Sequence, residues 1–84
     1  MAKILYFAWV RDAVGVDEEF VSIPVEIASV GALARYLSSR SVGHAQAFAD
    51  PARLRAAVDL VMVSFDAPIG DAKEIAFFPP VTGG

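Results

Sequence analysis

The groups in this sequence with the spacing to do chemistry are concentrated at its end. The chain closes with Phe-Phe-Pro-Pro-Val-Thr-Gly-Gly, residues 77–84. Two prolines hold the backbone extended, so the residues from Pro79 to Gly84 can reach about 20 Å. Gly83 and Gly84 lack a Cβ, which lets the tip enter a narrow channel. The pattern predicts a probe that carries the α-carboxylate of Gly84.

A functionless end is the alternative interpretation of this segment. Many domains finish in frayed tails, and a terminal Gly-Gly pair by itself does not distinguish them from a functional end. Such tails are usually polar, whereas the segment from Phe77 to Val81 is apolar and is stiffened by Pro79 and Pro80. This contrast favours a functional tail.

Side-chain chemistry is sparse elsewhere in the chain. Cysteine is absent, which excludes disulfides, thiolate metal sites and a cysteine nucleophile. With His44 as the single histidine, a metal site or a Ser-His-Asp triad has little to build from, and we expect a surface or capping role for it. The acidic run 17–19 is interpreted as the solvated start of a strand. We therefore expect no metal site and no active site within the chain alone.

Composition restricts the class of protein. Eighty-four residues, of which 56% are hydrophobic, predict one small domain with a substantial core. No apolar run approaches the roughly 18 residues of a membrane span, and no charged leader precedes an apolar segment. A net charge of −3 argues against nucleic acid as a partner. We expect a soluble, cytoplasmic protein that binds neither nucleic acid nor membrane.

The apolar pattern predicts five strands and one main helix. Ser29 offers a helix N-cap, and the spacing of Val30, Leu33, Ala34 and Leu37 is typical of one buried helical face. A further short helical turn is expected at 44–49, with Phe48 pointing inward. The strands are expected at 3–10, 18–23, 54–58, 61–65 and 74–78, with a turn at 11–17 that makes a hairpin of the first two.

This order indicates an α+β fold with one helix packed across one mixed sheet. Residues 1–79 are expected to form the domain and residues 80–84 the extended tail. Alternation along the strands places Ile75 and Phe77 on the inner face. On the opposite, uncovered face it gathers large apolar side chains of the size that marks a protein interface: Leu5, Phe7, Trp9, Met62 and Phe78.

Several stretches resemble a known family. The resemblance is carried by 76–84 and by Lys3-Ile4-Leu5-Tyr6-Phe7-Ala8, Val14-Gly15, Val63-Ser64-Phe65-Asp66, Pro68 and Glu74. Together they resemble the small subunits of molybdopterin synthase, which are ubiquitin-like sulfur carriers. The resemblance implies a β-grasp fold in which the first and last strands are adjacent and parallel at the centre of the sheet.

The same resemblance implies a chemistry and a set of partners. A ubiquitin-activating-like enzyme would use ATP to adenylate Gly84, and sulfuration would then give a thiocarboxylate. That group would enter the large synthase subunit and pass sulfur to a cyclic pyranopterin precursor of molybdopterin, with Gly83 providing clearance. No cofactor would be bound to this chain, which would not be catalytic alone. The residues expected to contact a partner are Phe7, Met62, Phe78, Pro79, Pro80, Val81 and Thr82.

The chain departs from the family pattern in two turns. A turn that usually begins with Asn reads Asp59-Leu60-Val61, and an Asp-Gly-Asp-Glu turn reads Asp71-Ala72-Lys73-Glu74. Leu60 is expected to extend the apolar face. Two rival functions stay open: a sulfur carrier for another pathway, such as thiazole synthesis, and a ubiquitin-like modifier or binding module.

Overall fold

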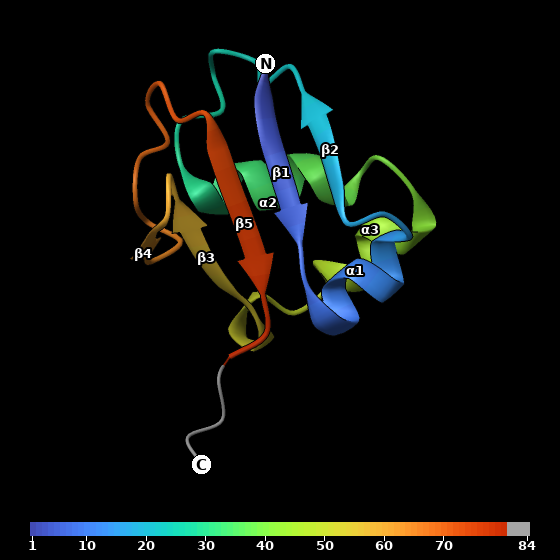
Figure 1. Ribbon diagram of the computed structural model, residues 1–84. Coiled ribbons are helices and arrows are strands. Elements are labelled where there is room, and N and C mark those ends of the chain that lie inside the picture. Colours follow the sequence, from blue (N-terminus) through green and yellow to red (C-terminus); the bar gives the residue numbers. More distant parts are fainter. Residues whose placement is uncertain (81–84) are drawn as a thin grey trace.

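The computed structural model describes residues 1–80. Its elements follow one another along the chain as Figure 1 shows. They are β1 (Ala2–Tyr6), α1 (Ala8–Val14), β2 (Glu18–Val21), α2 (Val30–Ser38), α3 (Val42–Ala47), the 3-10 helix η1 (Pro51–Arg53), β3 (Arg55–Val58), β4 (Val61–Val63) and β5 (Glu74–Phe78).

The strands form one mixed sheet in the order β2-β1-β5-β3-β4. The first and last strands, β1 and β5, are parallel neighbours, whereas the other pairs are antiparallel. β5 is therefore central, with β1 on one side and β3 on the other (Figure 1). This confirms the expected α+β β-grasp arrangement, in which the strand that leads into the tail is held on both edges.

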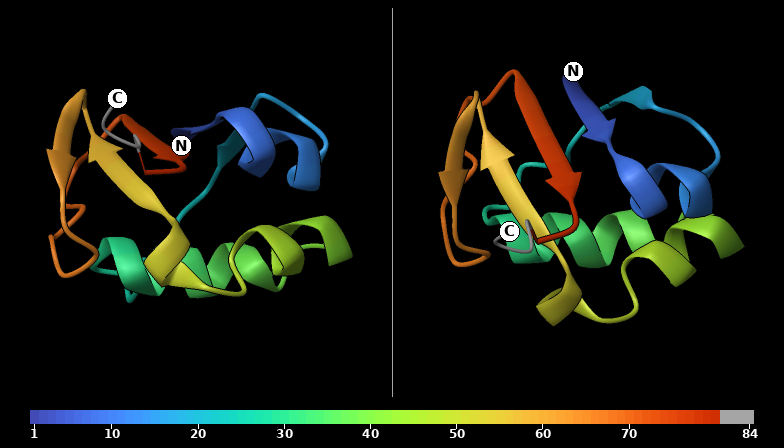
Figure 2. Two further views of the ribbon diagram at one scale, coloured as in Figure 1. Left: turned by 90° about the horizontal axis from the view of Figure 1, so that it is seen from below. Right: turned by 60° about the horizontal axis from the view of Figure 1, so that its bottom comes forward.

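The helices α2 and α3 cover one face of the sheet, as the view from below in Figure 2 shows. Ser29 caps α2 as predicted, because its side chain accepts a hydrogen bond of 3.1 Å from the backbone N–H of Ala32. The buried side of α2 is made of Val30, Leu33, Ala34 and Leu37, the four residues that the spacing indicated. Phe48 is buried behind α3 and meets Phe77 edge-on, with ring centroids 4.9 Å apart.

The prediction of one strand over residues 3–10 was wrong beyond Tyr6. Phe7 is an extended N-cap and residues 8–14 form α1, which ends at Gly15 with φ 98°. The run of aromatic and branched residues suggested a strand, but Val10 and Val14 also lie four apart, which suits one face of a helix. Packing of that face against the rest of the core decides in favour of the helix, and Val10 is fully buried. β1 and β2 are thus joined by a helix rather than by a hairpin turn.

The core lies between the sheet and the helices. Ile4, Tyr6, Ile75 and Phe77 point into it and are at most 1% exposed, as the predicted alternation requires. The second to fifth strands lie where they were expected. Two of them are shorter than predicted, because β2 ends at Val21 and β4 ends at Val63. The opposite face of the sheet is left uncovered by helices (Figure 2).

Candidate functional site

The tail leaves the molecule from the end of its central strand. We call Phe78, Pro79 and Pro80 the tail root. Phe78 lies opposite Arg55 of β3, and the backbone N–H of Phe7 donates to the carbonyl of Phe77 at 3.2 Å. Proline has no N–H to donate, so the ladder stops at this point. The predicted site residues Val81, Thr82, Gly83 and Gly84 lie outside the described part of the chain.

A row of apolar residues crosses the uncovered face. Leu5 is paired with Ala76, Ala76 with Ala57, and Ala57 with Met62. Side chains in register on neighbouring strands point to the same face of a sheet, so these four residues share it. Met62, at the edge of the row, is 64% exposed. The two alanines at the centre have small side chains that project little from the sheet, so another backbone can approach it closely.

Two phenylalanines adjoin this row at the end where the tail begins. Phe7 is 46% exposed and follows the last residue of β1, while the half-buried Phe78 ends β5. The structure therefore brings Leu5, Phe7, Met62 and Phe78 to one side of the molecule, and we call them the open-face patch. Their role in binding a partner stays a prediction.

Trp9 does not share the strand position that was expected for it. It lies on α1, is partly buried against the core, and the guanidinium carbon of Arg53 lies 4.8 Å from its ring centroid. The prediction placed Trp9 on the open face because it continued the strand to residue 10. In α1 the side chain of residue 9 points in a different direction.

Leu60, in the turn between β3 and β4, is 86% exposed at the sheet edge, so it is available to extend the open-face patch as expected. Val61 is 63% exposed, but it pairs with Val58 and Val58 with Ile75, so it lies on the other face of the sheet.

Asp59 and Leu60 both have positive φ, 46° and 72°, the backbone of a tight hairpin turn. The Asp59 carboxylate accepts hydrogen bonds of 3.0 Å from the backbone N–H groups of Lys73 and Glu74. One departure from the family pattern, Asp59, thus anchors the start of β5.

The sequence interpretation missed a cluster of polar side chains beneath the helices. One oxygen of the Glu19 carboxylate accepts from the Tyr6 hydroxyl at 2.6 Å and lies 2.7 Å from Nε2 of His44. The other ring nitrogen of His44 lies 2.7 Å from the Ser41 hydroxyl, and Arg40 lies 3.6 Å from Glu19. These five residues are the polar cluster.

Burial and pairing shift two pKa values in the polar cluster. Burial, assisted by the hydrogen bond to Glu19, raises the pKa of the Tyr6 hydroxyl above its ordinary range. Burial alone would raise the pKa of Glu19, but hydrogen bonds from His44 and Tyr6 outweigh it, and the pKa is lowered. The groups are satisfied by one another, so the cluster fixes α3 to β2 and does not form an open site.

The expectations for His44 and the acidic run need correction here. His44 is 7% exposed, not a surface residue, and its backbone N–H is capped by Ser41. Glu19 pairs with Ile4 across the strands, so it points toward the helices, while Glu18 is solvated as expected. The Ser41-to-His44 spacing of a cap and the inward parity of Glu19 were signals available in the sequence.

Comparison with known proteins gives the family. The family model described as "ThiS family" matches residues 4–84. The chain belongs to the ThiS family. The molybdopterin synthase sulfur carrier subunit of Escherichia coli K12 is 44% identical over 100% of both chains. The subunit of the same name from Haemophilus influenzae is 31% identical, again over 100% of both. The resemblance inferred from the sequence is confirmed.

Two solved structures agree with the observed fold. A putative molybdopterin converting factor, subunit 1, from Pyrococcus furiosus superposes with a TM-score of 0.75 and 32% identity, covering 95% of this chain and 97% of that one. SAMP1 from Haloferax volcanii superposes at 0.70 with 21% identity, over 99% and 98%, and supports the fold alone.

Residues 1–80 of this ThiS-family chain lack two further features. No helix there is long and apolar enough to cross a bilayer. Nor does that part of the chain gather three His, Cys, Asp or Glu side chains in a way that could hold a metal ion.

Proposed function

We propose that this chain is the sulfur carrier subunit of a molybdopterin synthase. The observation that carries the proposal is that the central strand β5 leads through Pro79 and Pro80 into the sequence Val-Thr-Gly-Gly, and that an exposed apolar face lies beside this strand. Similarity over the full length to two proteins named as such subunits supports it.

The proposed chemistry takes place on the terminal carboxylate. The carboxylate of Gly84 attacks the α-phosphorus of ATP, which is bound to a ubiquitin-activating-like enzyme, and pyrophosphate leaves. A sulfur nucleophile then displaces AMP from the acyl-adenylate, and the product is a thiocarboxylate. Its sulfur is ionised at neutral pH and attacks a carbon of the cyclic pyranopterin precursor, which gives a thioester; water then cleaves the acyl C–S bond, so the sulfur stays on the pterin and the Gly84 carboxylate is regenerated. Activation is necessary because oxide is a poor leaving group from a free carboxylate.

The proposed division of labour assigns binding to the patch and reaction to the tip. The open-face patch would dock on the large synthase subunit, with the low surface at Ala57 and Ala76 allowing close contact. The tail root would then deliver the last residues into the cleft of that subunit. Pro79 and Pro80 reduce the entropy lost on insertion, because their φ angles are already fixed. The large subunit supplies the cationic and catalytic groups.

The test measures the mass of the terminus and then its use. The chain is incubated with an activating enzyme, ATP and a sulfur source, and intact-protein mass spectrometry is expected to show sulfur replacing one oxygen. The thiocarboxylate form is then mixed with the large subunit and the precursor, and molybdopterin is expected in proportion to the carrier. A lysine adduct would instead indicate a protein modifier. Sulfur delivery to a thiazole but not to the pyranopterin would indicate the other carrier pathway.

A further inference from the structure

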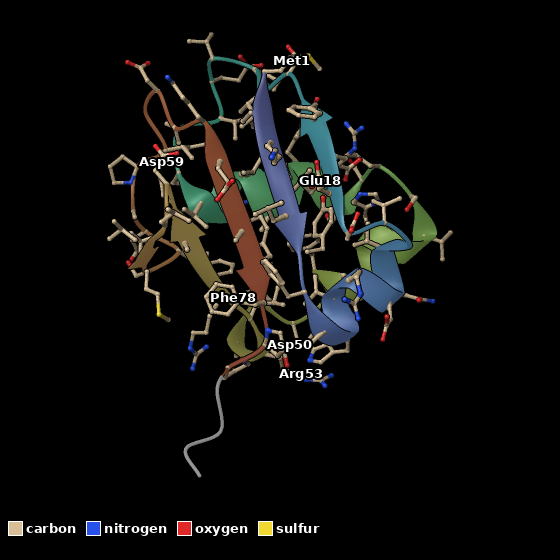
Figure 3. The ribbon with its side chains drawn as sticks, in the orientation of Figure 1. Met1, Glu18, Asp50, Arg53, Asp59 and Phe78 are labelled. Atoms are coloured by element: carbon tan, nitrogen blue, oxygen red, sulfur yellow. The ribbon has the colours of Figure 1, made fainter. Side chains whose placement is uncertain are left out.

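Two arginines lie at the end of the sheet where the chain leaves it. Arg53 is the last residue of η1, and Arg55 opens β3 opposite Phe78. Both side chains are exposed. Figure 3 shows Arg53 and Phe78 at the same end of the molecule, next to the root of the tail. We call Arg53 and Arg55 the arginine pair.

Contacts within the domain hold both side chains in place. Nη1 of Arg55 donates to the carbonyl of Leu54 at 2.8 Å, and the guanidinium of Arg53 lies over the ring of Trp9. Arginine stacks on aromatic faces in this way and retains its other N–H groups for a planar acceptor. Two side chains that are already positioned lose less entropy when a partner binds.

The arginine pair makes no salt bridge within residues 1–80, although Asp50, whose carboxylate accepts a hydrogen bond from the backbone N–H of Ala52, lies at the same end of the molecule (Figure 3). Among residues 1–80, neither guanidinium lies within 4.0 Å of a carboxylate; the pairs found there use Arg11, Arg40 and His44. Glu74 begins β5 and is separated from Phe78 by about 13 Å of strand, at 3.3 Å per residue. A protein with a net charge of −3 thus presents two positive groups at the base of its tail.

We propose that Arg53 and Arg55 pair with carboxylates on the rim of the cleft in the large subunit that receives the tail. The inference rests on the proposed function, because it needs that partner. When the tail is inserted, the tail root must lie at the mouth of the cleft. The arginine pair is fixed beside the root, so it faces the rim in every complex in which the tail is fully inserted.

Two other anionic groups could in principle pair with the arginines: the carboxylate of Gly84 and a nucleotide attached to it. Their distance from the tail root argues against both. The carboxylate of Gly84, and a nucleotide attached to it, lie up to about 20 Å from Pro79 along an extended tail. Rim carboxylates on a partner are the acidic groups that meet the arginine pair while the tip is engaged elsewhere. Charges placed on a rim act mainly on the association rate and on its salt dependence.

The test is stopped-flow association of the full chain with the large subunit at several salt concentrations. The double variant Arg53→Glu/Arg55→Glu is expected to lower the association rate constant about tenfold at low salt, within the range of electrostatic steering, with a weaker salt dependence. Its dissociation rate is expected to change much less. Arg53→Lys/Arg55→Lys, which retains the charge, is expected to keep most of the rate.

Lys73→Glu/Lys3→Glu is the matched control, because it changes the net charge by the same amount at the other end of β5. An equal loss in this control would overturn the proposal, since total charge would then explain the effect. Unchanged association of the arginine variant would overturn it too, as would faster association, which would indicate that the pair covers its own tail. Failure of the wild-type chain to bind the large subunit would instead contradict the proposed function, and the inference with it. Melting curves of each variant check that the domain is folded.

Discussion

Each face of the sheet carries one group of residues that is unusual for its surroundings. On the covered face, Glu19 and His44 are enclosed with Tyr6 beneath the helices, while on the open face Met62 and Phe7 are exposed to solvent. No buried side-chain nitrogen or oxygen lacks a hydrogen-bond partner within residues 1–80. The enclosed polar groups are complete without a partner, whereas the exposed apolar groups gain from one.

This difference separates folding from function in a small domain. Groups that satisfy each other internally contribute to stability, and their loss should be seen in unfolding experiments. Groups that remain exposed contribute little to stability, and their loss should be seen in binding or transfer. The following predictions test that separation.

The largest effect is expected at the tip of the tail. Adding one uncleaved residue after Gly84 should abolish sulfur transfer, because the carboxylate that is adenylated would no longer be at the position that fits the partner. Thermal unfolding should be unchanged, since the added residue follows the domain. The measurement is molybdopterin formation in a reconstituted assay beside a melting curve. Full product formation by the extended chain would contradict the assignment of Gly84.

A large loss of stability is expected where α1 and α3 touch. A Cβ built on Gly43 would lie 2.2 Å from the backbone oxygen of Ala13, so Gly43→Ala forces the two helices apart. We expect a loss of about 2–3 kcal/mol in the free energy of unfolding, measured by urea denaturation. The control is Ala45→Gly on the exposed side of α3, which should cost only about 1 kcal/mol of helix propensity.

If Gly43→Ala raised the free energy of unfolding above that of the wild type, α1 and α3 would not meet as described. The contact also bears on the open face, because Phe7 is the N-cap of α1. A shifted α1 is expected to move Phe7, so this variant should lose partner affinity together with stability.

Removal of the Glu19 carboxylate is expected to cause a smaller loss of stability, and this loss should depend on pH. Glu19→Gln weakens charge-assisted hydrogen bonds to Tyr6 and His44 and should cost about 1–3 kcal/mol. The folded-state pKa of Glu19 lies below its ordinary value of 4.5. Its contribution is therefore fully present above pH 4.5 and is lost as the pH falls through the folded-state pKa.

Unfolding free energies of wild type and Glu19→Gln measured between pH 3 and 7 should converge at the acid end. Glu18→Gln, an exposed neighbour on the other face, is the matched control and should leave the pH dependence unchanged. Curves for Glu19→Gln that stay parallel to the wild type at all pH values would contradict this assignment.

Truncation of the open-face patch should affect binding and spare the fold. Phe7→Ala or Phe78→Ala is expected to weaken association with the large subunit by about 1–3 kcal/mol, the range for aromatic anchors at an interface. Isothermal titration measures the affinity and circular dichroism the melting. Ile4→Ala, on the enclosed side, should do the reverse and destabilise the domain. If the phenylalanine variants unfold while Ile4→Ala does not, the two faces have been exchanged.

The smallest effect is expected at the turn at the sheet edge. Leu60 has a φ of 72°, which is unfavourable for a residue with a Cβ, and its side chain is almost fully exposed. Leu60→Gly should stabilise the domain by about 1 kcal/mol, the lower end of the cost of a left-handed L-residue, and weaken partner binding slightly. A stability decrease in a denaturant titration would show that the Leu60 side chain supports the fold.

The features that could be predicted from the sequence are local in origin. Helix α2 follows from the Ser29 cap and the spacing of Val30, Leu33, Ala34 and Leu37, all within one segment. The inward direction of Ile75 and Phe77 follows from the alternation along β5. The family and the sulfur-carrier chemistry follow from the residues of the tail. Caps, periodicities and terminal motifs are encoded in a few neighbouring residues, so they can be recognised without the rest of the chain.

The features that could not be predicted depend on contacts between segments that are distant in the sequence. Residues 8–14 suit a strand or a helix, and packing of Val10 in the core selects the helix. Glu19 and His44 are 25 residues apart. Nothing near either residue in the sequence indicates that the other will provide the hydrogen bond that its burial requires. The row from Leu5 to Met62 spans four strands, and only their order brings its members together. Such pairings are fixed when the whole core is buried, since the free energy that selects them comes from all the segments at once.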